Sequence, residues 1–277
     1  MITNQKNTLA HYSIKSAVLF FVITIFFSWL IWLPIIVFDM DTTQESPVGL
    51  VLFMLGGFGP SIIGLIFLKK SKAPDLKSRL LSIKKMGLKW FLLSLTIYPL
   101  LFGFSLLIHS LYGGEAPTGE LITDMLSNPI VFLISTVVIF LLGPLAEEVG
   151  WRGFALDSIQ RITSPLKSTI IISIVWWAWH LPLFLMPTTI HGENGIHSLF
   201  GYGYFFTIVG YSVLFTWLCN KSRNQSILIA ILAHFSINFV IGVLLPFDDN
   251  IFAIVMFILL ALSGGLIMAD RKLGYKN

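Results

Sequence analysis

Charged residues are scarce in this chain. They make up 12% of its 277 residues, whereas hydrophobic residues make up 56% and the mean hydropathy is +0.85. A soluble domain averages about 25% charged residues, so the composition excludes an ordinary soluble globule. The sequence therefore predicts an integral membrane protein.

Cysteine and the common metalloprotease motif are missing as well. The single cysteine, Cys219, excludes an internal disulfide and a cluster of thiolate zinc ligands, and we interpret it as a small core hydrophobe. The chain contains no His-Glu-x-x-His pair on one helix. The first apolar run, residues 14–38, is too long for a signal-peptide core and lacks a small-residue cleavage site near its end, so we expect it to be retained.

The apolar runs have the length of membrane-spanning helices. Helices that cross about 30 Å of hydrocarbon need roughly 17 to 25 apolar residues. Eight runs qualify, at approximately residues 14–38, 48–68, 90–110, 129–147, 168–187, 199–219, 226–246 and 251–268. They are continuously apolar and do not alternate, which favours helices over barrel strands. The expected fold is one all-α membrane-embedded domain over residues 1–277, with eight transmembrane helices.

Lys and Arg are absent from one side of this predicted topology. All 18 basic residues fall on the side of the two chain ends, at Lys6, Lys15, Lys69, Lys70, Lys72, Lys77, Arg79, Lys84, Lys85, Lys89, Arg152, Arg161, Lys167, Lys221, Arg223, Arg271, Lys272 and Lys276. The opposite loops contain no Lys or Arg, and their charged residues are all acidic, at Asp39, Asp41, Glu45, Glu115, Glu120, Asp124, Glu193, Asp248 and Asp249. The positive-inside rule then predicts a multi-pass protein of the cell membrane with both termini cytoplasmic.

The net charge of +4 does not indicate nucleic-acid binding. The basic residues lie next to the predicted membrane boundaries, and no soluble domain presents them to a duplex. The expected partners are the lipid bilayer and a peptide or membrane-protein substrate. The segment 69–89 is expected to form a short surface helix that sets the topology.

Ionisable groups inside the apolar runs are the main functional signal, because they are costly in hydrocarbon. Glu147 and Glu148 end the fourth run. Glu148 and Arg152 are four residues apart in the favourable order for a helical ion pair. Glu147 is turned by about 100° from Glu148 and is free to face a cavity. Gly143-Pro144, one turn earlier, predicts a kink that turns this segment inward.

Two later runs carry the other polar groups. His180 lies deep in the fifth run, and Trp176, four residues before it, shares its helical face. In the seventh run His234 and Asn238 lie on one face, and a shared cavity would satisfy both. A lone buried histidine or asparagine often only links helices, but acid, two imidazoles and an amide on three helices favour a functional site. The remaining histidines, His11, His109, His191 and His197, are expected to be solvated.

These motifs resemble those of the CPBP (ABI) family, which includes CAAX prenyl endopeptidases and bacteriocin-processing or immunity proteins. The resemblance rests on Glu147-Glu148-x-x-x-Arg152, on the aromatic residue four before His180, and on His234-x-x-x-Asn238. The aromatic is normally phenylalanine and here is Trp176. The similarity covers residues 125–245, which we expect to form the catalytic core.

The resemblance implies intramembrane peptide hydrolysis in a site that opens to the cytoplasm, and we expect it to proceed without a cofactor. Glu147 would activate a water together with His180, and His234 and Asn238 would stabilise the oxyanion. Glu148, Arg152 and Trp176 would support them. One glutamate and two histidines are also a possible zinc set, although zinc leaves Asn238 unexplained.

Two other classes of function compete with hydrolysis. A proton-coupled transporter usually shows repeated halves with matching broken helices, which this sequence lacks. A non-enzymatic bacteriocin-immunity or scaffold protein is the stronger alternative, although the intact polar set argues against it. The sequence leaves the substrate open among a prenylated protein, a leader peptide, a membrane anchor and a bacteriocin.

Overall fold

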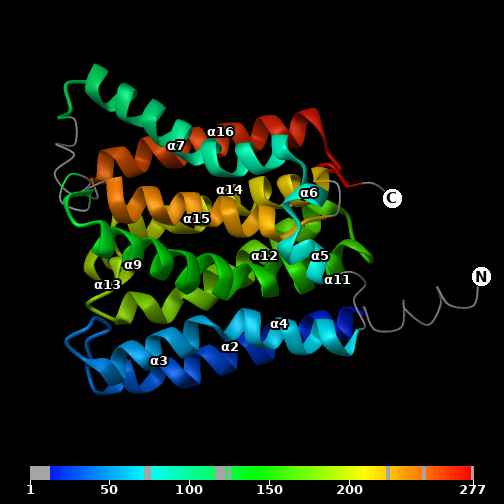
Figure 1. Cartoon of the computed structure of the whole chain (residues 1–277), viewed down its shortest axis with the longest axis horizontal. Helices are drawn as coiled ribbons and strands as arrows, with labels where there is room; N and C mark the ends of the chain where they lie inside the picture. Colours follow the sequence, from blue (N-terminus) through cyan, green and yellow to red (C-terminus); the bar gives the residue numbers. More distant parts are fainter. Residues whose placement is uncertain are drawn as a thin grey trace, which may run out of the picture.

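The computed structural model describes residues 13–71, 76–115, 123, 126–222, 225–244 and 248–275, and over these ranges the regular elements are helices. The long helices run roughly parallel or antiparallel in one bundle (Figure 1). They are α2 (Ile14–Val37), α3 (Pro47–Gly57) continued by α4 (Gly59–Lys70), α7 (Leu88–Leu111), α12 (Pro165–His180), α14 (Leu199–Lys221), α15 (Ile227–Leu244) and α16 (Asp249–Ala269). The prediction of an all-α polytopic membrane protein is confirmed.

The fourth predicted span is longer than expected. It runs from Pro129 to Gln160 as one 32-residue helical segment. Its parts are α9 (Pro129–Phe140), the π-helical η1 (Leu141–Leu145), α10 (Ala146–Glu148), the π-helical η2 (Val149–Ala155) and α11 (Leu156–Gln160). Arg152, which follows the predicted end of this run at residue 147, therefore lies inside the helical segment and is buried.

Seven helical segments of the described ranges are long and apolar enough to cross a membrane. The predicted run 226–246 forms α15, a shorter apolar helix that packs against α7 and α14. The count of eight spans stays a prediction, because α15 is shorter than the other seven.

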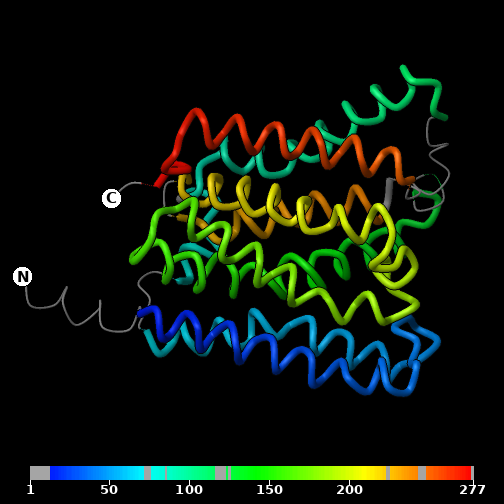
Figure 2. Tube along the Cα trace, turned by 180° about the vertical axis from the view of Figure 1, so that it is seen from behind, coloured from blue at the N-terminus to red at the C-terminus, as the bar shows by residue number. Residues whose placement is uncertain are grey.

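The bundle has two distinct ends. The start of α2 and the end of α16 lie at the same end in both views (Figures 1 and 2), together with α11 and the short helices α5 (Leu76–Leu81) and α6 (Ile83–Met86). We call this end the terminal face. The opposite end, the loop face, carries residues 38–46, α13 (Ile190–Asn194) and Asp248. Several residues of the charge pattern, and one of the histidines, lie outside the described residues, namely Lys6, His11, Lys72, Glu120, Asp124, Arg223 and Lys276.

The segment 69–89 contributes more than topology. Its described part after residue 75 forms two short helices, α5 and α6, where one was expected, and Arg79 of α5 is 7% exposed. Its guanidinium pairs with Asp157 of α11 at 2.6 Å and donates a hydrogen bond from Nε to the carbonyl of Gln225. These contacts attach the segment to the end of the 32-residue span.

Glycines bring this span close to α4. A Cβ on Gly150 would lie 2.2 Å from the carbonyl oxygen of Pro60, and a Cβ on Gly64 would lie 2.6 Å from Cα of Gly150. Small residues commonly permit such close backbone contact between membrane helices, where there is no hydrophobic drive for association. The contact fixes the depth and rotation of the segment that carries Glu147.

Candidate active site

Wide helical turns surround Glu147. Pro144 has no N–H to donate, so it disturbs the α-helical hydrogen-bond ladder, and the chain winds as a π-helix over η1. The carbonyl of Leu145 accepts a hydrogen bond from Ser61 Oγ of α4 at 2.7 Å. The kink expected at Gly143-Pro144 thus takes the form of π-helical turns, which are frequent at functional sites. The three-residue α10 between η1 and η2 carries both glutamates.

Glu147 is 5% exposed and lines an internal cavity. Trp176 Nε1 donates a hydrogen bond of 2.5 Å to its Oε2 atom. A phenylalanine at position 176 has no N–H group, so the tryptophan here adds a contact to the carboxylate as well as an aromatic surface. The hydrogen bond holds the side chain of Glu147 against α12.

Glu148 lies behind Glu147 and joins two helices. Its Oε1 atom accepts a hydrogen bond from Arg152 Nη1 at 3.1 Å, the ion pair expected from their spacing. The same oxygen is 2.9 Å from His234 Nδ1 of α15, a contact that the sequence analysis missed. Because the two groups lie on different helices, sequence spacing gave no signal for it. Glu148 therefore fixes the imidazole of His234 as well as the guanidinium.

Arg152 is enclosed on every side. It donates from Nη2 to Ser212 Oγ of α14 at 3.0 Å. Its guanidinium carbon lies 4.4 Å from the ring centroid of Trp176 and 4.8 Å from that of Phe215. Cation–π contacts of this kind are strong where water is excluded. Arg152 consequently ties together the span of Glu147, α12 and α14.

His180 ends α12. Its Nδ1 atom is 2.7 Å from the carbonyl oxygen of Trp176. A carbonyl only accepts, so Nδ1 carries the proton and the neutral ring has its lone pair on Nε2. His180 is buried and lines the same cavity as Glu147.

His234 and Asn238 approach the Glu147 segment at Gly143. A Cβ on Gly143 would lie 2.4 Å from Asn238 Nδ2 and 3.6 Å from His234 Nε2. Both nitrogens therefore lie close to the Cα of this glycine, which carries no side chain. The pattern Gly143-Pro144 predicted a kink, and it gave no sign that Gly143 also makes room for these side chains.

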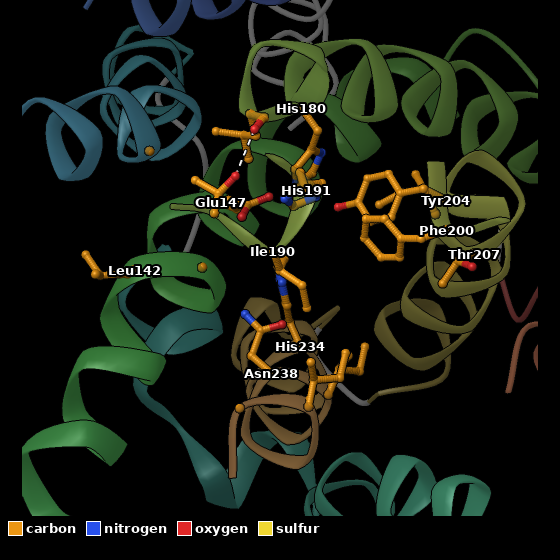
Figure 3. A pocket seen from close by; sticks show the side chains of 18 of the residues that line it. Leu142, Glu147, His180, Ile190, His191, Phe200, Tyr204, Thr207, His234 and Asn238 are labelled. Carbon is orange, nitrogen blue, oxygen red and sulfur yellow. Dashed lines mark hydrogen bonds between the residues drawn. The ribbon is translucent and has the colours of Figure 1, made fainter. Parts of the chain in front are cut away.

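A cavity of about 520 Å³ connects these groups. Figure 3 shows Glu147, His180, His234 and Asn238 around one space, with Phe200 and Tyr204 on its far side. Trp176 also lines it, whereas Glu148 and Arg152 are absent from its lining. Aromatic and aliphatic side chains form most of the remaining wall, which suits an apolar segment next to a few polar groups.

His191 is a further residue of this cavity, and its expected solvation is wrong. It is 8% exposed, and its ring stacks on that of His180 with centroids 5.5 Å apart. The short α13 carries it inward, because Thr189 Oγ1 donates to the carbonyls of Leu183 and Met186. His197 is exposed as expected, and His109 is half-buried. The sequence of this loop, which lies outside the predicted spans, gave no sign that one of its histidines is buried.

The arrangement provides the components of a hydrolytic site. It offers a carboxylate, an imidazole with an unprotonated nitrogen, and two further nitrogens close to Gly143, in a cavity largely shielded from water. Among the described residues, no three His, Cys, Asp or Glu side chains are grouped so that they could hold a metal ion.

Comparison with known proteins agrees with this chemistry. Residues 129–240, which span the 32-residue segment through α15, match the model of the family described as type II CAAX prenyl endopeptidase Rce1-like. The chain is also 29% identical over 270 residues to "CAAX prenyl protease 2" of Methanococcus maripaludis, with 94% of this chain and 96% of that protein covered. Over the matched residues the chain is therefore similar to type II CAAX prenyl endopeptidases, and the two matches together indicate a membrane protease.

Proposed function

We propose that the protein is an intramembrane endopeptidase whose cavity holds one water between Glu147 and a substrate peptide bond. The observation that carries the proposal is the shared cavity. It brings Glu147, His180, His234 and Asn238 together from three separate membrane segments. The expectation from sequence assigned the same four residues to catalysis.

The proposed first step is attack by the water on the scissile carbonyl carbon. Glu147 takes one proton from the water as the oxygen–carbon bond forms. His180 Nε2 accepts a hydrogen bond from the same water and orients it, since its Nδ1 proton is directed to the carbonyl of Trp176. Glu147 then passes the proton to the leaving amine as the carbon–nitrogen bond breaks. Acid and amine are the products, and no oxidant or metal enters the balance.

His234 Nε2 and Asn238 Nδ2 are proposed to donate hydrogen bonds to the oxyanion of the tetrahedral intermediate. For Nε2 to donate while Nδ1 donates to Glu148, the imidazole must hold both protons. The carboxylate of Glu148 stabilises that positive charge. The aspartate of a Ser-His-Asp triad acts on its histidine in the same way. One such donor contributes about 3 to 4 kcal/mol to the transition state in enzymes where it was removed.

Zinc is the rival mechanism, and it is directly testable. Glu147, His180 and His234 are the chemically suitable ligands, but Trp176 holds one oxygen of the acid. We propose metal-free hydrolysis because it gives Asn238 a role, as a hydrogen-bond donor to the oxyanion, whereas zinc coordination does not. Elemental analysis of the active purified protein decides the question, and one zinc per chain that activity requires would overturn the metal-free mechanism.

We further propose that both termini are cytoplasmic, because the loops on the side of the two chain ends contain Lys and Arg, whereas the opposite loops contain none. The first substrates to try are peptides with and without a prenyl group on cysteine, since the archaeal relative is named a CAAX prenyl protease. Exported leader peptides and bacteriocins are the next candidates.

The central experiment measures cleavage of an internally quenched peptide by wild-type protein and by Glu147→Gln. The amide cannot accept the proton, so we expect turnover to be lost while the melting temperature in detergent stays the same. Retained turnover would refute Glu147 as the base. Peptide mass spectrometry on membranes with wild-type or Glu147→Gln protein identifies natural products, and a cellular phenotype that survives Glu147→Ala would instead favour the scaffold or immunity alternative.

A further inference from the structure

A third histidine of the cavity has no role in the proposed reaction. His191 is 8% exposed and lines the cavity together with His180. Its Nε2 atom is buried and has no hydrogen-bond partner among the described residues. Buried polar side chains are almost always hydrogen-bonded, so an unsatisfied nitrogen on a cavity wall requires an explanation. A partner that enters the cavity from outside the chain provides one.

The loop between α12 and α14 holds His191 in its inward position. Thr189 Oγ1 accepts a hydrogen bond from the backbone N–H of Gly192 at 3.1 Å, at the beginning of α13. A Cβ on Gly192 would overlap the carbonyl oxygen of Met186, so a residue without a side chain lets α13 fold back this closely. The burial of His191 therefore follows from specific contacts within its own loop.

His191 lies directly beside the group that is proposed to orient the water. Its ring stacks on that of His180, with the centroids 5.5 Å apart and the planes inclined by 26°. The ring of Tyr204 on α14 meets both imidazoles edge-on, at centroid distances of 4.7 Å from His191 and 5.3 Å from His180. Figure 3 shows these three side chains grouped away from Asn238. His191 thus extends the polar part of the cavity wall beyond His180.

Burial keeps the ring of His191 uncharged. Desolvation lowers its pKa to about 3, because it disfavours the charged form. A neutral imidazole has one donor and one acceptor nitrogen, which match the C=O and N–H groups of a peptide backbone. The rings of Phe184 and Phe200, at centroid distances of 5.1 Å and 5.6 Å, enclose the imidazole and offer it no competing hydrogen bond.

The distance between the two imidazoles indicates which part of a peptide His191 reaches. An extended chain advances roughly 3.5 Å per residue. A ring 5.5 Å from that of His180 is therefore one or two residues along the chain from a peptide bond attacked by the water that His180 orients.

We propose that His191 is a substrate-binding residue whose Nε2 atom forms a hydrogen bond with a backbone peptide group one or two residues from the scissile bond. The inference deepens the proposed function and rests on it. Such a contact sets the register of the peptide against the water held by Glu147 and His180. It recognises the backbone of the substrate and tolerates different side chains at that position.

The test measures binding without cleavage, in a Glu147→Gln background. The probe is a fluorescent form of the peptide that the wild-type protein cleaves, and its anisotropy is recorded in detergent. His191→Phe keeps an aromatic ring against His180 and removes both nitrogens, whereas His191→Gln keeps a hydrogen-bonding group near the position of Nε2. We expect Kd to rise at least ten-fold with His191→Phe and less than three-fold with His191→Gln, at unchanged melting temperature at pH 7.

His197→Phe is the matched control, because His197 belongs to the same loop, is exposed, and is absent from the cavity lining. Equal Kd values for His191→Phe and His197→Phe would overturn the proposal. Equal weakening by His191→Phe and His191→Gln would also overturn it, because the shape of the ring and not its hydrogen bond would then govern binding.

A scan of the peptide identifies the contacted group. Each backbone amide within two residues of the scissile bond is replaced in turn by an ester, which removes one N–H and weakens the carbonyl as an acceptor. One ester should weaken binding about as much as His191→Phe does, and it should have little further effect in the His191→Phe protein, since contacting groups are not additive. Esters that weaken binding equally in both proteins would contradict a backbone contact.

The outcomes separate this inference from the proposed function. If the Glu147→Gln protein still cleaves the quenched peptide, the proposed function fails. If cleavage is lost with Glu147→Gln while His191→Phe leaves Kd unchanged, the hydrolytic site stands and the role of His191 alone is refuted.

Discussion

The indole N–H of Trp176 donates a 2.5 Å hydrogen bond to the carboxylate of Glu147, and the guanidinium of Arg152 lies 4.4 Å above the same indole ring. One tryptophan therefore contacts both the proposed base and the buried cation. Its N–H fixes the direction of the carboxylate, and its ring covers the charge behind it.

Replacing this tryptophan by phenylalanine tests the hydrogen bond alone. Hydrogen bonds to charged groups contribute about 1.5 to 3 kcal/mol, so Trp176→Phe should lower the melting temperature and, because the carboxylate of Glu147 loses its fixed direction, should lower kcat about ten-fold or more. Trp177→Phe is the matched control, since this neighbour is absent from the cavity lining and its Nε1 is buried without a partner among the described residues. Equal activity of the two variants would show that the bond to Glu147 has no catalytic consequence.

A substitution of Gly143, which lies next to the amide of Asn238, tests the proposed oxyanion contact. Gly143→Ala adds a methyl group 2.4 Å from Asn238 Nδ2, so the amide has to move. If it donates to the oxyanion, kcat should fall about 100-fold, the range seen when one such donor is removed. Gly264→Ala on α16 is the control, because its Cβ would meet no atom within 4 Å. A Gly143→Ala enzyme as active as Gly264→Ala would contradict the role of Asn238.

Glu148 is predicted to act on both stability and turnover. Glu148→Gln leaves the buried guanidinium of Arg152 without its anionic partner, which costs about 3 kcal/mol or more in comparable buried pairs. It also removes the charge beside His234, so activity should fall with stability. The control is Asp270→Asn, which breaks the partly exposed pair with Lys221 and should cost less than about 1 kcal/mol. Thermal unfolding in detergent measures both, and equal losses would argue against a special role of the buried network.

His191 predicts a pH dependence. It lies in the loop outside the spans, and burial lowers its pKa to about 3, because desolvation disfavours the charged ring. The unfolded-state pKa is about 6.5, so the neutral ring's contribution to stability is complete above that pH and is lost as the pH falls toward 3.

Between pH 7 and pH 5 this loss amounts to about 2 kcal/mol. The melting temperature of the wild type should therefore fall more over this interval than that of His191→Phe, which cannot be protonated. His197→Phe serves as the control, because His197 is exposed and should leave the pH dependence of the wild type unchanged. The prediction fails if His191→Phe and wild type lose stability in parallel.

Much of the fold follows from periodic or continuous properties of the sequence. The apolar runs gave the helices within a few residues, because a span needs a fixed length of apolar chain. They placed the end of the fourth span too early, at residue 147, because Glu147, Glu148 and Arg152 read as a membrane boundary. The structure keeps the helix continuous to Gln160 and neutralises Glu148 and Arg152 within the protein.

The sequence predicted the individual residues of the candidate site, but it did not predict the hydrogen bonds that join them across helices. Spacing along one helix identified the pair of Glu148 with Arg152 and the common face of His234 and Asn238. Contacts between helices left no such trace, which is why the bonds from Glu148 to His234 and from Trp176 to Glu147 were not foreseen. His191 was missed for the same reason, since hydrogen bonds from Thr189 inside a short loop turn it inward.

The ion pair between Arg79 and Asp157 affects the position of residues far from the surface where it forms. Asp157 and Glu147 belong to the same uninterrupted helical segment, ten residues or about 15 Å apart. The ion pair restricts rotation of the helix about its axis at Asp157. It therefore also restricts the direction in which the side chain of Glu147 points. Loss of this ion pair would therefore remove one of the constraints on the segment that carries Glu147, at a distance from the cavity.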